Sequence, residues 1–191
     1  METRELLLAV HAGPRNLEPL VTGGLSDEQM LERPGGLNSV AWLVWHIARC
    51  EDVAINTVVR GVPQVLEDGW RDRIGVEAVH IGTESSPEEL RQFDAGVDAG
   101  ALKAYREAVA EQTAAWLGEC DPSTLPEDAR STERLEAAPD SIAERAGWAR
   151  ELWDGQTRLW FVTWLAAGHH YLHLGEAQVT RERLGRGLRF A

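Results

Sequence analysis

The sequence contains little cysteine, little positive charge and no long hydrophobic run, and each of these absences excludes a class of protein. Its two cysteines, Cys50 and Cys120, lie in different segments and form no Cys-x-x-Cys motif, so a disulfide framework is not expected. The formal net charge of −12 argues against nucleic-acid binding, because a phosphate backbone needs a basic protein face. The longest apolar run, residues 159–168, is far shorter than the ~20 residues of a membrane span.

The N-terminal segment METRELLLAV has an apolar run that is too short for a signal peptide. We therefore expect a soluble cytoplasmic protein with neither a membrane nor a nucleic-acid partner. A length of 191 residues suits one domain that covers residues 1–191, and a hydrophobic content of 43% is enough for a substantial core.

Helical periodicity dominates the sequence, without a convincing alternating pattern of strands. Asn38 follows Arg-Pro-Gly-Gly and is the expected N-cap of one long helix. Residues 62–95 are mostly irregular, and residues 121–141 form a long polar connection. We predict an all-α, up-and-down bundle of three or four long helices with a long crossover connection and extra short helices. The longer helices are expected at residues 3–21, 38–60, 98–117, 141–153 and 157–184.

The segment AAGHHYLHLGEAQ, residues 166–178, holds three of the six histidines. Residues four apart share a helix face, so His169 and His173 point the same way, whereas His170 is rotated by about 100°. His46 lies on an inward-facing line of another predicted helix and is the best third partner. Three neutral imidazoles that leave open positions suit zinc or nickel, so we predict that His46, His169 and His173 bind a divalent metal ion.

Other interpretations of the histidines stay open at this point. Pairs with this spacing occur by chance, and a histidine such as His46 is more often a hydrogen-bonded core residue than a ligand. His170 either supports a ligand or is exposed, while His11 and His80 resemble ordinary surface or loop residues. Cys50 falls in an apolar helical pattern and is expected to be a reduced, buried thiol.

Charged residues near the histidines add candidate roles. Glu176 follows His173 by three residues on the same face, so it is a candidate fourth ligand, imidazole partner or general base. The alternative is a solvated glutamate that pairs along its own helix. Arg49, one turn from His46, is a candidate to bind an anionic substrate, with a surface role as the alternative.

The segment NSVAWLVWHIARCEDVAIN, followed much later by HHYLHLGEAQ, resembles the DinB/YfiT-like superfamily of metal-binding helical bundles. The resemblance implies an up-down-down-up four-helix bundle, with one histidine on the second helix and an H-x-x-x-H-x-G-Q pattern on the last. His46, His169 and His173 match this pattern, and Gly175 stands at the glycine position. Glu176 departs from it, because it replaces the usual glutamine and adds a negative charge near the proposed ion.

The resemblance also implies a class of chemistry. Relatives include thiol-dependent transferases and a mycothiol-dependent maleylpyruvate isomerase, in which the metal lowers the pKa of a small thiol. We therefore expect a metal-dependent enzyme that acts on a small molecule, with mycothiol or bacillithiol as co-substrate, and a homodimeric assembly. The alternatives are a metal-dependent hydrolase, a non-catalytic metal- or ligand-binding stress-response bundle, and a bundle whose histidines bind no metal.

Overall fold

The computed structural model describes residues 2–187, and every regular element within this range is a helix. The predicted all-helical fold is therefore confirmed. The predicted domain, residues 1–191, extends slightly beyond the described range at both ends. The long helices are α1 (Thr3–Thr22), α3 (Val40–Asp52), α6 (Ala99–Glu119) and α10 (His169–Arg183), and the short α9 (Arg158–Trp160) precedes α10.

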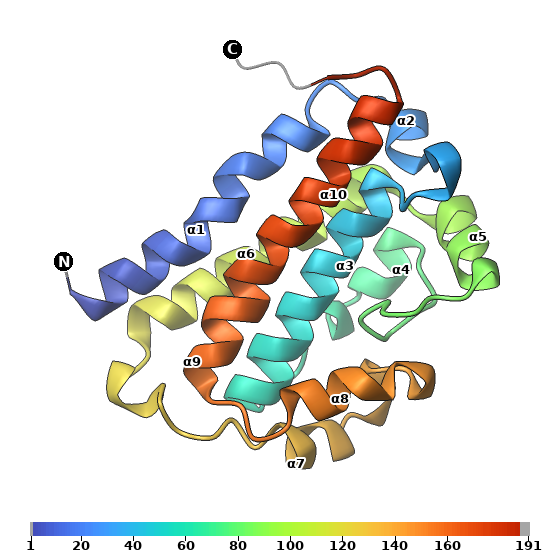
Figure 1. Ribbon diagram of the computed structural model, residues 1–191. Coiled ribbons are helices and arrows are strands. Elements are labelled where there is room, and N and C mark those ends of the chain that lie inside the picture. The colour runs from blue at the N-terminus through green and yellow to red at the C-terminus, as the bar shows by residue number, and fades with distance from the viewer. Residues whose placement is uncertain (1, 188–191) are drawn as a thin grey trace.

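Two of these helices are lengthened by π-helical stretches. α3 continues directly into Val53–Arg60, and Phe161–Gly168 joins α9 to α10. Four long helical segments therefore form the body of the molecule (Figure 1). In that view α1 rises, α3 and α6 descend, and α10 rises again.

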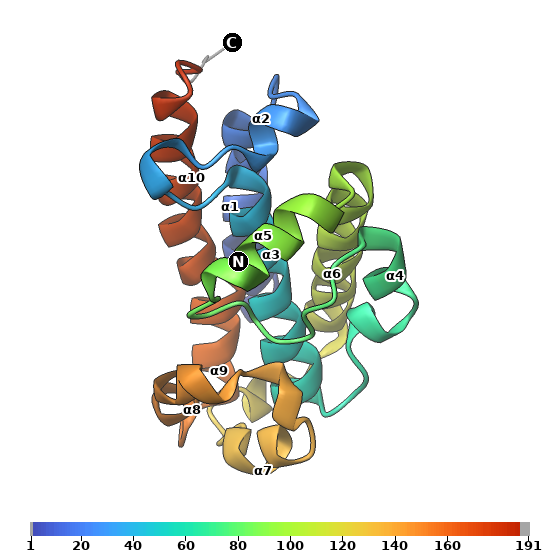
Figure 2. The ribbon, with the colours of Figure 1, turned by 90° about the vertical axis from the view of Figure 1, so that its right-hand side faces the viewer.

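α3 is the central helix of the bundle. It packs against α6 and α10, and Figure 2 shows it lying between them. All its residues, from Val40 to Asp52, are buried, whereas an ordinary surface helix buries only one stripe. The polar side chains of α3 must therefore find their partners inside the protein.

Short helices occupy the connections between the long ones, as the sequence predicts. They are α2 (Asp27–Leu31), α4 (Trp70–Ile74), α5 (Pro87–Gly96), α7 (Ser131–Glu136) and α8 (Gly147–Trp153). The helix predicted at residues 141–153 begins only at Gly147. Ile142 is extended, and the Ser141 carbonyl accepts a hydrogen bond from the Ile81 N–H at 2.9 Å instead of starting a helix. Within the described residues, no helix is both long and apolar enough to cross a membrane.

The start of α3 lies one residue later than predicted. Ser39 is the N-cap, because its hydroxyl oxygen accepts a hydrogen bond from the Trp42 N–H at 3.2 Å. Asn38 instead offers its carbonyl to the Thr180 hydroxyl at 2.9 Å, which ties the start of α3 to α10. Adjacent asparagine and serine are both good caps, so the local sequence does not separate them.

The prediction that Arg49 lies at the surface or binds a substrate is wrong. Its side chain is fully buried, and Nη1 donates to Asp52 at 3.0 Å and to the Tyr105 hydroxyl at 2.9 Å. Nη2 donates to Gln64 and to the Val79 carbonyl. Arg49 therefore holds α3, α6 and the connection before α5 together.

Candidate metal centre

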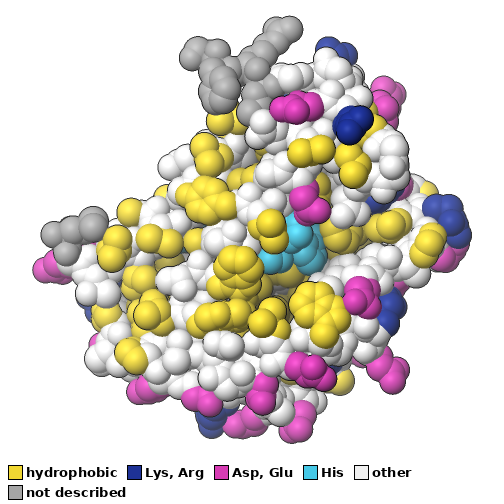
Figure 3. Space-filling view, viewed as in Figure 1, with side chains coloured by type: hydrophobic (Ala, Val, Ile, Leu, Met, Phe, Trp, Pro, Cys, Tyr) yellow, Lys and Arg dark blue, Asp and Glu magenta, His cyan; other side chains and the backbone are white. Residues whose placement is uncertain are grey.

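The packing of α10 against α3 brings the three predicted ligands together. The ring centroids of His169 and His173 are 4.3 Å apart. The ring centroid of His46 lies 5.1 Å from that of His169 and 4.6 Å from that of His173. His46 is buried, whereas 15% of the His173 side chain is exposed. The cluster thus runs from the core to the surface, and Figure 3 shows histidine side chains in a hollow bordered mainly by hydrophobic groups.

Hydrogen bonds orient two of the three rings. His46 Nδ1 lies 2.5 Å from the Ile81 carbonyl oxygen, so Nδ1 carries the proton and Nε2 keeps its lone pair. His173 Nδ1 contacts the Glu176 carboxylate, which leaves its Nε2 free in the same way. That Nε2 lies 3.0 Å from His169 Nε2. Such partners at the second ring nitrogen are typical of metal-binding histidines.

Cys50 is a candidate ligand that the sequence analysis missed. The ligand atoms of His46, Cys50 and His169 all lie within 4.8 Å of one another. Cys50 Sγ is 3.7 Å from His46 Nε2, and burial raises the pKa of its thiol. The residue is buried and reduced, as predicted. Its spacing from His46 is the same four residues that unite His169 and His173, so the signal was present in the sequence.

The histidines are held in the form that binds metals. Burial, followed by the neighbouring His173, lowers the pKa of His46 to about 3. Burial, followed by the neighbouring His46, also lowers the pKa of His169 far below its ordinary value. Both rings are therefore neutral near pH 7, as metal coordination requires. In addition, His169 Nδ1 is buried without a hydrogen-bond partner among the described residues.

This donor set fits a divalent transition-metal ion. Imidazole nitrogens with one thiol are ligands that zinc favours, and imidazole also suits nickel. We call the side chains of His46, Cys50, His169 and His173 the outer cluster.

Aromatic side chains flank the outer cluster. The Trp42 ring stacks on His46 with a centroid distance of 5.0 Å and an interplanar angle of 5°. Trp164 meets His169 edge-on at 6.3 Å. A Cβ on Gly168 would lie 2.7 Å from the Trp164 ring, so this glycine lets the indole lie against the helix.

The segment around residues 80–86 supports His46 from outside the bundle. Besides the Ile81 carbonyl, it contains His80, whose Nδ1 accepts from the Gly82 N–H and whose Nε2 lies 3.0 Å from Glu89. The prediction that His80 is an ordinary surface or loop residue is therefore incomplete, because this partly buried ring braces the segment. Trp148 on α8 donates to Glu84 at 2.7 Å and anchors the same segment.

A second group of histidines lies deeper in the bundle. His11 is buried, contrary to the prediction of a surface position, and its Nε2 lies 2.7 Å from Glu51. Arg106 Nη1 donates to Glu51 at 2.7 Å. His170 is fully buried as well, with Nδ1 3.4 Å from Arg106 and Nε2 3.6 Å from Glu51. We call these four residues the inner cluster.

The inner cluster is built around one negative charge. Burial raises the pKa of Glu51, but Arg106 and the hydrogen bond from His11 outweigh it and hold that pKa well below the usual range. Burial and the nearby Arg106 lower the pKa of His170. His170 is therefore neither exposed nor in the outer cluster, and its backbone position beside His169 does not bring it to the candidate metal site.

Glu176 lies at the rim of the outer cluster, with 48% of its side chain exposed. Of the roles predicted for it, the contact with His173 Nδ1 corresponds to the imidazole partner. Within the described chain it makes no side-chain hydrogen bond along its helix other than this one.

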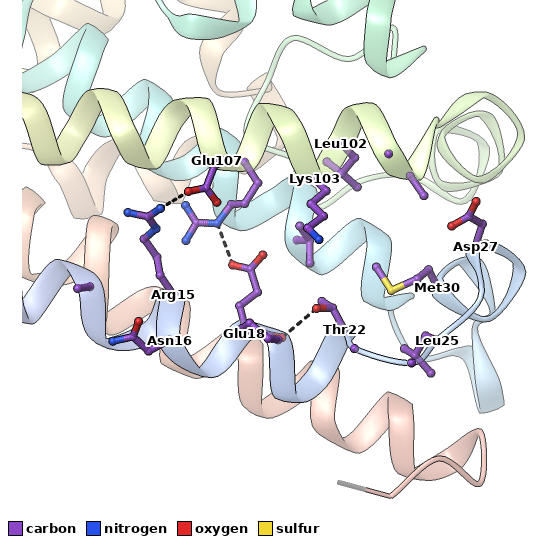
Figure 4. Close-up of a pocket in the computed structure, with 18 residues that line it drawn as sticks. Arg15, Asn16, Glu18, Thr22, Leu25, Asp27, Met30, Leu102, Lys103 and Glu107 are labelled. Atoms are coloured by element: carbon purple, nitrogen blue, oxygen red, sulfur yellow. Dashed lines mark hydrogen bonds and ion pairs between the residues drawn. The ribbon is translucent and has the colours of Figure 1, made fainter. Parts of the chain in front are cut away.

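A sizeable cavity lies away from the candidate metal centre. A space of about 650 Å³ lies between α1 and α6, and no member of the outer cluster lines it (Figure 4). Its charged walls are largely paired internally, since Arg15 binds Glu107 and Arg106 binds Glu18. The cavity therefore borders the inner cluster through Arg106 and not the candidate metal site.

The fold and the site define a helical bundle with a candidate metal centre between two of its long helices. The chain belongs to the DinB superfamily, whose family model matches residues 9–177 and so includes the whole outer cluster. A crystal structure of a conserved protein from Enterococcus faecalis has the same fold, with a TM-score of 0.69 and 19% identity over 97% of this chain and 99% of that chain. No curated protein matches the sequence.

Proposed function

We propose that the protein is a metal-dependent enzyme in which His46, His169 and His173 hold a zinc or nickel ion. One observation carries the proposal. His46 and His173 both use Nδ1 for a hydrogen bond, so their Nε2 lone pairs remain free beside His169. Hydrogen bonds of this kind, at the ring nitrogen that does not bind the metal, raise the basicity of a histidine ligand and fix the orientation of its ring.

We further propose that the substrate chemistry is transfer of a small thiol, such as mycothiol or bacillithiol, to an electrophile. A bound divalent ion would supply Lewis acidity, which lowers the pKa of a thiol that binds to it. The half-exposed Glu176 is the candidate acceptor of the thiol proton. Trp42 and Trp164 flank the imidazoles and give the site an apolar border.

Cys50 favours a second candidate function, a non-catalytic site that stabilises the bundle. Structural zinc sites are usually closed by four protein ligands, whereas catalytic sites keep one position open. The ligand atoms of His46, Cys50 and His169 lie within 4.8 Å of one another, and His173 Nε2 lies 3.0 Å from His169 Nε2. The outer cluster therefore holds four candidate donors, one of them a thiol. The two functions therefore differ in whether Cys50 binds the ion.

A cobalt experiment separates these functions. Protein purified without chelators or an affinity tag is depleted of metal, loaded with Co²⁺ and examined by absorption spectroscopy, alongside Cys50→Ser. We expect no sulfur-to-cobalt charge-transfer band in the wild type, and we expect mycothiol or bacillithiol to create one. A strong band without added thiol that disappears in Cys50→Ser would instead support the structural site.

Turnover then tests the thiol transfer itself. The zinc- or nickel-loaded protein is incubated with mycothiol or bacillithiol and a chromogenic electrophile, and His46→Ala serves as the control. We expect turnover that needs both the thiol and His46. Metal-loaded protein that shows no thiol-dependent turnover would contradict the enzymatic proposal.

We also propose a homodimer. Support comes from apolar side chains exposed on α8, the π-helical turn and α10, namely Trp148, Leu152, Trp164, Leu172 and Val179. Sedimentation of the purified protein tests this.

The cytoplasmic location stays a prediction.

A further inference from the structure

A second cavity lies directly beside the candidate metal centre. It has a volume of about 340 Å³, within the range of roughly 300–1,000 Å³ that is typical of small-molecule sites. Its walls come from α3, from α5 and from the segment before α5, which Figure 2 shows in front of α3.

Trp42 connects this cavity to the outer cluster. Trp42 lines the cavity, and its ring stacks on His46 with a centroid distance of 5.0 Å. Residues 75–80 also line the cavity, and the chain continues from them directly to Ile81, whose carbonyl orients His46. The cavity and the candidate ligand His46 therefore share Trp42 as a neighbour.

The apolar walls of the cavity are flat and aromatic. Trp42, Trp45 and Phe93 all line it, with centroid distances of 6.4 Å between the two indoles and 5.5 Å between Trp45 and Phe93. Val76 and Val79 complete the apolar surface. Aromatic rings prefer offset or edge-to-face contacts with other rings, so these walls favour a planar guest.

The charges around the cavity disfavour an anion. Its lining contains two carboxylates, Glu77 and Glu89, and neither lysine nor arginine. The Glu89 pKa is held at about 2 because hydrogen bonds from Ser86 and Arg145 outweigh the effect of burial, so this group is ionised at neutral pH. Both carboxylates already have arginine partners, Arg71 and Arg145, so a cationic guest gains little.

We propose that this cavity binds a planar, uncharged aromatic or conjugated group of the molecule processed at the metal centre. The catalytic meaning of this assignment rests on the proposed function, but the binding itself does not. Because Trp42 contacts both the cavity and His46, a group bound in the cavity would lie one residue away from the candidate metal centre. The cavity thus selects the electrophile, while the outer cluster activates the thiol.

Calorimetric titration with 2-naphthol tests the binding, with metal-free and zinc-loaded protein in parallel. We expect saturable binding to both forms. The anion 2-naphthoate should bind at least about tenfold more weakly, because its charge would be buried beside Glu89 without a partner. The saturated analogue decahydro-2-naphthol should also bind more weakly, because it is not planar.

Two substitutions in the cavity wall and one control outside it locate the site. Ala78→Trp fills the cavity and should weaken 2-naphthol binding at least about tenfold, while Ala104→Trp, on the exposed face of α6, should not change it. Phe93→Leu removes one aromatic wall with less perturbation and should weaken binding to a smaller extent. Circular dichroism verifies that each variant is folded.

The results separate this inference from the proposed function. Binding of 2-naphthol that is absent, or equal in wild type and Ala78→Trp, would overturn the aromatic subsite even if the protein binds zinc. Conversely, the subsite stands if 2-naphthol binds as expected to a protein that takes up no metal.

Discussion

His169 and His170 are neighbours in the chain, yet they belong to two clusters with different physical character. His170 faces the inner cluster, where Glu51 provides a negative charge for two histidines and Arg106. His169 faces the outer cluster, where imidazole nitrogens and a thiol face one another and the nearest carboxylate, Glu176, lies at the rim. One cluster is closed to solvent, and the other reaches it through His173.

The difference shows how a binding site can be told from a structural network. Buried polar groups normally have partners, and those of the inner cluster are arranged around one buried charge. In the outer cluster, His46 and His173 each use Nδ1 for a hydrogen bond. Among the described residues, their Nε2 atoms contact only other members of the cluster: His173 Nε2 faces His169 Nε2, and His46 Nε2 faces Cys50 Sγ. His170 Nε2 of the inner cluster also lacks a hydrogen-bond partner among the described residues. The candidate metal centre is therefore marked by imidazole nitrogens and a thiol that converge without a charged group between them.

The largest effect should come from removing the charge at the middle of the inner cluster. Glu51→Ala leaves Arg106 buried without its main partner, which should lower the free energy of unfolding by about 3–5 kcal/mol. Chemical denaturation measures this loss. A loss below about 1 kcal/mol would show that the inner cluster is not the structural network described here.

The two adjacent histidines should differ in the same measurement. In metal-free protein, His170→Ala removes a fully buried ring and should cost about 2–4 kcal/mol. His169→Ala removes a partly exposed ring whose Nδ1 lacks a partner and should cost about 1 kcal/mol or less. Equal losses for both variants would remove the distinction between the clusters.

Acid should destabilise the metal-free protein through the outer cluster. The pKa of His46 is about 3 when folded and 6.5 in its ordinary state, so the unfolded chain binds more protons between these values. The contribution of His46 to the free energy of unfolding is therefore intact above pH 6.5. It falls by about 1.4 kcal/mol per pH unit as the pH drops toward 3. His46→Gln should reduce this slope in denaturation curves recorded from pH 7 to 4. An unchanged slope would contradict the assignment.

The smallest effect should come from the rim. Glu176→Gln keeps an oxygen acceptor for His173 but removes the negative charge, so zinc affinity should fall by about tenfold or less. Stability without metal should stay within about 0.5 kcal/mol, because the side chain is half-exposed. Competition with a chromophoric chelator measures the affinity. Tighter zinc binding in this variant would argue against Glu176 as the partner of His173.

Much of the fold and half of the site can be predicted from the sequence. Helical periodicity gives the long helices, and four-residue spacing brings His169 and His173 to one face. The same spacing rule, applied to His46, also indicates Cys50. These are local properties, which one helix determines by itself.

The remainder depends on contacts between distant segments. The burial of His11, His170 and Arg49 depends on which helices surround them, and a single helix pattern does not contain that information. The Ile81 carbonyl that orients His46 comes from a segment with little regular structure. Its position is fixed by Ser141 and α8, far along the chain, so no local pattern identifies it.

Metal content per chain tests the central claim most directly. Wild type, His169→Ala and His170→Gln are purified without chelators or an affinity tag, supplied with zinc, dialysed and subjected to elemental analysis. We predict about one ion per chain in wild type and in His170→Gln, and a background level in His169→Ala. An equal metal content in wild type and His169→Ala, or none in either, would contradict it.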